Sequence, residues 1–144
     1  DDDHLHAVSS ATSRDMQLAI DKAKTTAQTD LAQQLGTRLG NLTRQFGEET
    51  GLEEDSQLLS QFSSATKAVA DQSMSGARVE KQQLQAERGI YRSYVLVRLP
   101  IGQANQLLMK KIKADQALHT RLRGTQAYAD LDLELQQLAE RKGQ

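Results

Sequence analysis

The most regular pattern along the chain is a row of apolar residues that recur every four positions in its first third. The row consists of Ala19, Ala23, Ala27, Leu31, Leu35 and Leu39, and Leu42 and Phe46 continue it. This spacing predicts a long amphipathic helix from Asp15 onward. Because alanine side chains are small, the axis of this helix can lie close to the surface that it covers. We expect that surface to be a β-sheet.

The residues before the helix alternate in the manner of a short strand. Residues 5–10, LHAVSS, place His6 and Val8 on one side and Leu5 and Ala7 on the other. Thr12 and Asp15 then have the spacing of a capping box, in which the Thr12 hydroxyl accepts a backbone hydrogen bond near Asp15. This motif predicts the start of the long helix.

Two further segments separate this helix from the second half of the chain. Residues 47–56, GEETGLEEDS, are predicted to form a loop because they hold two glycines and several carboxylates. A second helix should follow, and its apolar stripe consists of Leu58, Leu59, Phe62, Ala65 and Val69.

From Ala77 the apolar period changes toward two, which is typical of strands. The segment ARVEKQQLQAERGIYRSYVLVRLP has Arg88 and Gly89 at its middle, and it predicts a β-hairpin that ends at Pro100. One face of the second arm holds Tyr91, Val95, Val97 and Leu99, which we expect to face the long helix.

Residues 103–142 are helical by composition, with an interruption at Gly124. After this glycine, Leu131, Leu135 and Leu138 are spaced as in a coiled-coil seam, so we expect them to contact a neighbouring subunit. The predicted fold is α+β: long helices packed on a small antiparallel sheet of about three strands, with a C-terminal helical extension. Residues 1–102 form the predicted α+β domain and residues 103–144 the extension.

Composition narrows the class of protein. Aromatic residues make up 3% of the 144 residues and Trp is absent, so the core is built from small apolar side chains, and helix packing between subunits would bury more surface. A net charge of -1 argues against nucleic-acid binding. The sequence holds no apolar run long enough to span a membrane. Because the first residue is Asp and not Met, we expect a processed, exported protein.

Charge is distributed unevenly along the chain. One acidic group consists of Glu48, Glu49, Glu53, Glu54 and Asp55, and one basic group consists of Lys110, Lys111, Lys113, Arg121 and Arg123. We expect the acidic group of one subunit to contact the basic group of the next, which gives a ring if the contacts close and a filament if they do not. The alternatives are two solvated surfaces, or pairing within one chain.

The sequence offers few groups for chemistry. A strand would place His4 and His6 on one side, where they could bind Zn²⁺ or Cu²⁺ with Asp1, Asp2 and Asp3, but a solvated terminus is the favoured interpretation. No P-loop, nucleophile elbow or HExxH motif is present. His119 is the remaining histidine. We therefore expect no enzyme activity, no cofactor and no metal.

The order of these segments resembles a known family. An N-terminal strand leads into Ala19, Ala23, Ala27, Leu31 and Ala32, and a late hairpin holds Gly89 followed by YVLVRL at residues 94–99. This arrangement is similar to the Lpp-twenty family, the twenty-kilodalton surface lipoproteins of Gram-negative bacteria, whose relatives include flagellar outer-membrane and basal-disk assembly proteins. The resemblance covers roughly residues 5–108.

The resemblance implies an exported, non-enzymatic protein that assembles into dimers, rings or larger arrays. Lipidated members carry an acylated Cys at the mature N-terminus, and this chain has no Cys, so either a lipid anchor lies upstream of Asp1 or this protein is exported without lipid. We predict a self-associating structural protein of the periplasm, outer membrane or cell surface, with other envelope proteins as further partners. The alternative is a monomeric periplasmic adaptor or ligand-binding module.

Overall fold

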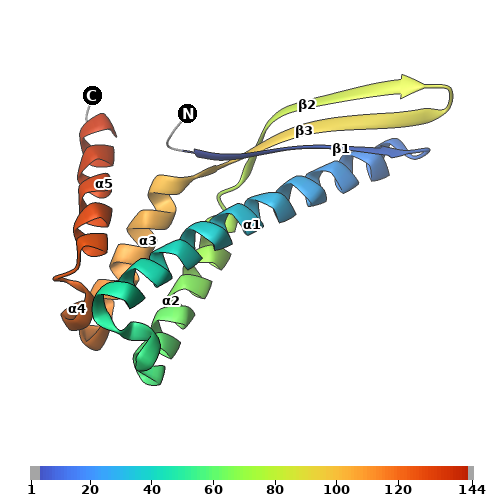
Figure 1. Ribbon diagram of the computed structural model, residues 1–144. Helices are drawn as coiled ribbons and strands as arrows, with labels where there is room; N and C mark the ends of the chain where they lie inside the picture. Colours follow the sequence, from blue (N-terminus) through green and yellow to red (C-terminus); the bar gives the residue numbers. More distant parts are fainter. Residues whose placement is uncertain (1–3, 143–144) are drawn as a thin grey trace. The chain divides into compact units, whose positions relative to one another are not determined.

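The computed structural model describes residues 4–142, and over this range the predicted α+β fold is confirmed (Figure 1). In chain order the elements are β1 (His4–Ser13), α1 (Met16–Thr50), the 3-10 helix η1 (Leu52–Glu54), α2 (Ser56–Met74), β2 (Arg78–Glu87), β3 (Ile90–Pro100), α3 (Ile101–Ala114), α4 (Gln116–Leu122) and α5 (Gln126–Lys142). The hairpin turn lies at Arg88 and Gly89, as predicted, and both residues have positive φ angles.

The chain forms two compact units, each built from two segments. The first unit runs to Leu35 and resumes from Ser73 to Pro100, and the second holds Gly36–Gln72 and the described residues from Ile101 on. Helix α1 passes from one unit into the other without interruption. The division predicted at residue 102 lies next to the last crossing between the units. However, the second unit also includes residues 36–72, which the sequence placed in the first domain.

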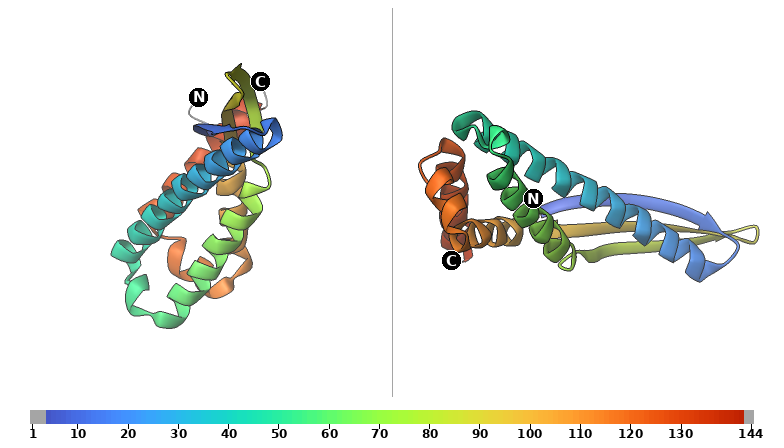
Figure 2. Two further views of the ribbon diagram at one scale, coloured as in Figure 1. Left: turned by 90° about the vertical axis from the view of Figure 1, so that its right-hand side faces the viewer. Right: turned by 90° about the horizontal axis from the view of Figure 1, so that it is seen from below.

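The first unit contains a three-stranded antiparallel sheet with the order β1-β3-β2. Strand β3 is central, with Ala7 of β1 and Val79 of β2 both opposite Val97. A bulge interrupts the pairing of β2 between Val79 and Lys81. Figure 2 shows the first part of α1 crossing one face of this sheet.

Alanines allow α1 to lie directly on that face. Ala19, Ala23 and Ala27 are fully buried, as the four-residue spacing predicted. The sheet contributes Val95, Val97 and Leu99, each at most 2% exposed, and also Ser93, whose burial was not predicted from the sequence. Tyr91, placed in this layer by the sequence, is only half-buried.

Helix α1 begins at Met16, close to the predicted start at Asp15, but the predicted capping residue is wrong. Thr12 belongs to β1 and not to a capping box, because the strand continues to Ser13 in order to pair with β3 as far as Tyr91. Asp15 performs the capping: its Oδ1 accepts a hydrogen bond from the Leu18 amide at 3.0 Å. The Asp15 amide donates to Ser13 Oγ at 3.1 Å. A carboxylate at this position satisfies one of the free amides of the first turn.

The second unit is helical, and its first corner is shorter than the sequence predicted. The predicted loop at residues 47–56 is wrong at its start, because α1 continues to Thr50 and buries Phe46, whose ring lies 5.5 Å from that of Phe62 in α2. The chain turns at Gly51, where φ is 69°. Leu52 is fully buried, so apolar packing holds the corner in place.

Helices α3, α4 and α5 complete the second unit. Their buried residues are Ala104, Asn105, Leu108, Met109, Ile112, Leu118, Leu122, Ala127 and Leu131. Asp115 caps α4 by accepting from the Leu118 amide at 3.2 Å. Among the described helices, none has the length and apolar content needed to cross a membrane.

Candidate self-association surfaces

The acidic group forms the corner between α1 and α2. Glu48 and Glu49 lie in the last turn of α1, Glu53 and Glu54 in η1, and Asp55 directly before α2. Asp55 is used within the chain, because its Oδ1 accepts from the Leu58 amide at 3.2 Å and caps α2. Glu48 and Glu54 are exposed, so both are available to another molecule.

Glu49 caps the last helix from a distant part of the sequence. Its Oε1 accepts a hydrogen bond from the Gln126 amide at 2.7 Å, and its Oε2 accepts from the Ala127 amide at 3.0 Å. A carboxylate in this position satisfies two free amides and lies at the positive end of the helix dipole. Glu49 therefore has a structural role within one chain.

Arg121 caps the end of α1 at the same corner. Its Nε and one terminal nitrogen donate to the Thr50 carbonyl oxygen, at 3.3 Å and 3.0 Å. This carbonyl lies at the end of α1, where helix carbonyls lack partners within the helix. Together with Glu49, Arg121 joins the end of α1 to α4 and α5. Glu49, Asp55 and Arg121 are therefore used in hydrogen bonds to the backbone of their own chain, and not in a pairing of the acidic group with the basic group.

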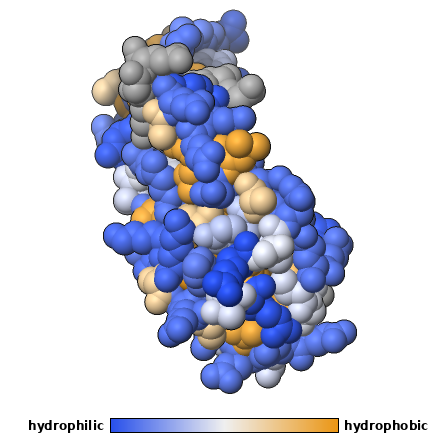
Figure 3. Space-filling model, turned by 90° about the vertical axis from the view of Figure 1, so that its left-hand side faces the viewer, coloured by the Kyte–Doolittle hydropathy of each residue, from blue (hydrophilic) through white to orange (hydrophobic). Residues whose placement is uncertain are grey.

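The rest of the basic group remains at the surface. Lys110, Lys113 and Arg123 are exposed, and Lys111 is half-buried. Among the residues whose side chains are described, no ion pair joins the acidic group to the basic group. The remaining charges are therefore available for contacts between molecules. The face seen in Figure 3 is largely hydrophilic, with hydrophobic residues in small patches.

The leucines expected to contact a neighbour are involved in the fold of the second unit. Leu131 is 2% exposed, so its side chain packs within its own unit. Leu135 and Leu138 are half-buried, and the Leu138 side chain lies against Gly102 at the start of α3. The coiled-coil spacing is the same whether the partner helix belongs to another chain or to the same one. The exposed leucine of α5 is Leu133, at 52%.

Polar contacts also hold α5 in place. Glu134 Oε2 accepts from Arg38 of α1 at 3.1 Å and from the Asn105 amide group of α3 at 3.0 Å. This carboxylate links three helices of the second unit. Helix α5 is therefore an integrated part of this unit.

Two of the histidines, His4 and His6, lie close together on β1. The rings of His4 and His6 are 6.2 Å apart, and His6 Nε2 lies 3.5 Å from Glu80 Oε2. No group of three metal-binding side chains is found among the described residues. Asp1, Asp2 and Asp3 lie outside the described residues. His119 Nε2 is 3.3 Å from the Tyr128 hydroxyl, a contact that fixes α4 against α5.

An open hollow lies in the second unit. It has a volume of about 590 Å³ and is lined by Leu58, Gln116, Ala117, Thr120 and Arg121. The hollow is open to solvent, and the Arg121 guanidinium already donates to Thr50. Its lining includes the Thr120 hydroxyl and the Arg121 guanidinium as polar groups.

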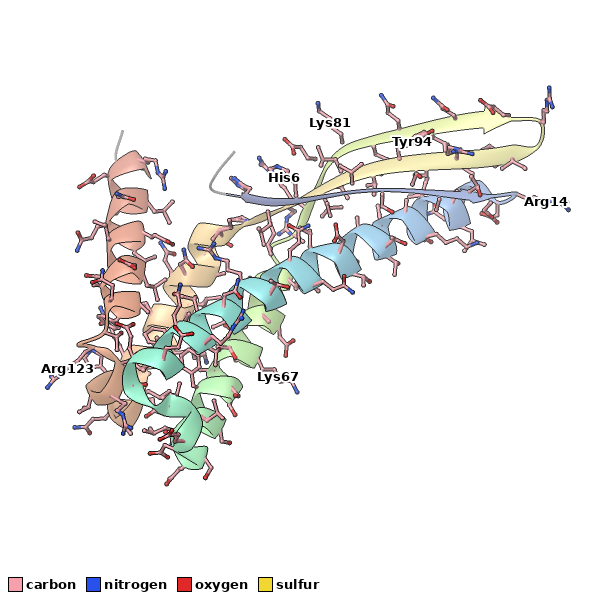
Figure 4. The ribbon with its side chains drawn as sticks, in the orientation of Figure 1. His6, Arg14, Lys67, Lys81, Tyr94 and Arg123 are labelled. Carbon is pink, nitrogen blue, oxygen red and sulfur yellow. The ribbon has the colours of Figure 1, made fainter. Side chains whose placement is uncertain are left out.

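The exposure of β2 was not predicted from the sequence. All ten residues of this strand are exposed, including Val79 at 41% and Leu84 at 39%. Figure 4 shows Lys81 of β2 pointing away from α1. The missing alternation of apolar and polar residues in RVEKQQLQAE was the signal that could have identified a strand with no buried face.

Comparisons with known proteins leave the family undecided. Neither the models of known protein families nor the curated proteins include a match to this sequence. The resemblance to the Lpp-twenty family therefore stays a prediction.

Proposed function

We propose that this protein is a non-enzymatic, exported structural component that associates with copies of itself into a ring, filament or array at the bacterial cell envelope. The observation that carries self-association is the strand β2, which lies at the edge of a sheet with every residue exposed. Free strand edges pair readily with other strands, and soluble proteins usually protect them.

Charge supports the same function. Both charged groups have exposed members. These are Glu48 and Glu54 in the acidic group, and Lys110, Lys113 and Arg123 in the basic group. A contact between different surfaces of two copies repeats from one copy to the next. The Lpp-twenty resemblance adds the envelope location and the assembled state as parts of the proposal.

Light scattering on the purified protein across protein and salt concentration tests the proposal. We expect a particle mass above that of the monomer, rising with protein concentration. Salt should reduce the mass, because exposed charges are screened within about 8 Å at physiological ionic strength. A monomer under every condition would overturn the proposal.

A monomeric adaptor or ligand-binding module is the second candidate. The open hollow beside Leu58 and Thr120 favours it, because a concave surface of about 590 Å³ is large enough for a small ligand or a partner's side chains. A monomer whose amide NMR signals around this hollow shift on addition of envelope extract fractions would support the adaptor.

A further inference from the structure

Strand β2 has one neighbour in its sheet and a free edge on the other side. The order β1-β3-β2 places it at the margin of the sheet, and none of its ten residues is buried. Its backbone N–H and C=O groups along the free edge can pair with a strand of another molecule. Which strand pairs with this edge is inferred below, and the inference rests on the proposed function of self-association.

The pairing with β3 assigns each side chain of β2 to a face of the sheet. Leu84 lies opposite Ser93, which is buried under α1, so Leu84 is on the helix-covered side. Gln82 and Ala86 share this face, because side chains alternate along a strand. Beyond the bulge, the opposite face holds Lys81, Gln83, Gln85 and Glu87.

Symmetry restricts how two copies of β2 can pair. Two identical antiparallel strands in one continuous sheet are related by a two-fold axis perpendicular to the sheet. This axis keeps each face on its own side, so every residue must lie opposite a residue of its own face. The axis can therefore pass through Leu84 or through a neighbouring residue, and each choice gives a different set of partners.

We propose that β2 pairs with β2 of a second copy of this chain, with Leu84 opposite Leu84 of the second copy. This register places Lys81 opposite Glu87 of the second copy, and the same pair forms twice because of the symmetry. Gln83 then faces Gln85, and Gln82 faces Ala86. Opposite charges and apolar side chains directly across an antiparallel pair stabilise it. Residues 81–87, which follow the bulge, pair without interruption.

The neighbouring registers lack this complementarity. An axis through Gln83 sets Lys81 against Gln85, and an axis through Gln85 sets Lys81 against Gly89. In neither register does Lys81 meet a carboxylate directly across the pair. Lysine often protects edge strands from pairing, but opposite Glu87 its charge becomes specific for this register.

The other edge of the sheet fits a second copy less well. Strand β1 holds no pair of opposite formal charges, because its ionisable side chains are His4 and His6 alone. In addition, the His6 carbonyl already accepts a hydrogen bond from Gln34 of α1 at 2.9 Å. The β2 edge has the charge complementarity that the β1 edge lacks.

Single cysteines test the register directly, since the chain has no cysteine of its own. In the proposed dimer, L84C places two thiols opposite each other at the axis, within the range that a disulfide bridges. Q82C and A86C are the matched controls on the same face. Each lies two residues from the axis, so its two copies are separated by about 13 Å along the strands.

Under mild oxidation we expect L84C to give a covalent dimer, and Q82C or A86C alone to stay monomeric on a non-reducing gel. A mixture of Q82C and A86C should give the heterodimer, because these positions face each other. Equal cross-linking at all three positions would overturn the register. A covalent dimer of V8C in place of L84C would assign the contact to β1.

Charge reversal gives an independent measurement without cysteine. K81E or E87K alone replaces two attractive pairs with two repulsive ones, so we expect the dissociation constant of the dimer to rise about tenfold. The double variant K81E/E87K should restore the original value. K67E is the control, because Lys67 is an exposed residue of α2 and carries the same charge change. A double variant as weak as the single ones would overturn the pairing.

The two proposals fail in distinguishable ways. A protein that is monomeric at every concentration fails both. If the protein assembles but L84C does not cross-link and K81E has no effect, the β2 pairing is overturned. Self-association is still supported in that case.

Discussion

At the scale of single residues, Ser93 is the clearest mismatch between a side chain and its surroundings. It is fully buried between β3 and α1, and its hydroxyl oxygen has no hydrogen-bond partner among the described atoms. A buried hydroxyl without a partner costs about 1–3 kcal/mol. We expect S93A to raise the free energy of unfolding by about 1 kcal/mol, which corresponds to a rise of about 2–4 °C in the thermal midpoint. Calorimetry measures this shift.

S10A is the matched control for this prediction. Ser10 lies on β1 and is exposed, so its hydroxyl is solvated in the folded and unfolded states, and its removal should change the midpoint little. A lower midpoint for S93A would mean that the hydroxyl has a partner that stabilises the sheet.

Single residues also explain why the candidate self-association surfaces were only partly predictable from the sequence. Spacing correctly predicted the burial of Ala19, Ala23 and Val97, because one periodic stripe faces one surface. Spacing could not reveal that Leu131 packs within its own unit. A leucine stripe indicates that a helix has a partner, but the chain to which the partner belongs is decided by tertiary contacts that no local pattern contains.

At the scale of elements, the contact between α1 and α5 depends on Glu49. Its carboxylate accepts from two amides at the start of α5, at 2.7 Å and 3.0 Å. Because substitution of a helix cap costs about 1 kcal/mol, we expect E49A to destabilise the second unit by that amount. The loss should appear as faster amide hydrogen exchange in residues 126–130. The control E48A changes an exposed carboxylate in the same turn and should leave this exchange unchanged.

The comparison between E49A and E49Q separates two contributions at this cap. Glutamine keeps one acceptor oxygen but loses the charge that interacts with the helix dipole. We therefore expect E49Q to fall between the original protein and E49A. Exchange in α5 that is the same for all three proteins would contradict a capping role for Glu49.

The ends of elements were harder to predict than their order. The sequence gives the correct order of strand, helix, helix, hairpin and helices, because the change between periods of about four and two is visible in it. The end of α1 was placed too early, since the two glycines and five acidic residues of residues 47–56 favour a loop locally. Burial of Phe46 and Leu52, together with the contact of Arg121 with Thr50, outweighs this local preference.

At the scale of the whole molecule, the two candidate contacts produce different assemblies. Pairing of β2 with β2 joins identical surfaces, so it ends at a dimer. A contact between the exposed acidic residues of one copy and the basic residues of another joins different surfaces and can continue indefinitely. A ring or filament therefore requires the contact between the acidic and basic residues. The β2 dimer forms without it.

Complementary charge reversal tests this second contact. We expect K110E/K113E to stop assembly at the dimer, because two exposed lysines of the basic group then repel Glu48 and Glu54 of the next copy. The variant E48K/E54K should also stop at the dimer for the same reason. Sedimentation velocity measures the size of the particles.

A mixture of these two variants separates a specific contact from a general effect of charge. In the mixture, the acidified helix of one variant meets the basic corner of the other, so the contact is restored in reversed polarity. This contact joins a copy of one variant to a copy of the other, and each β2 pair adds a further copy to the assembly. The mixture should therefore sediment as particles larger than dimers, whereas each variant alone should not. Large particles for either variant alone would show that assembly proceeds through another surface.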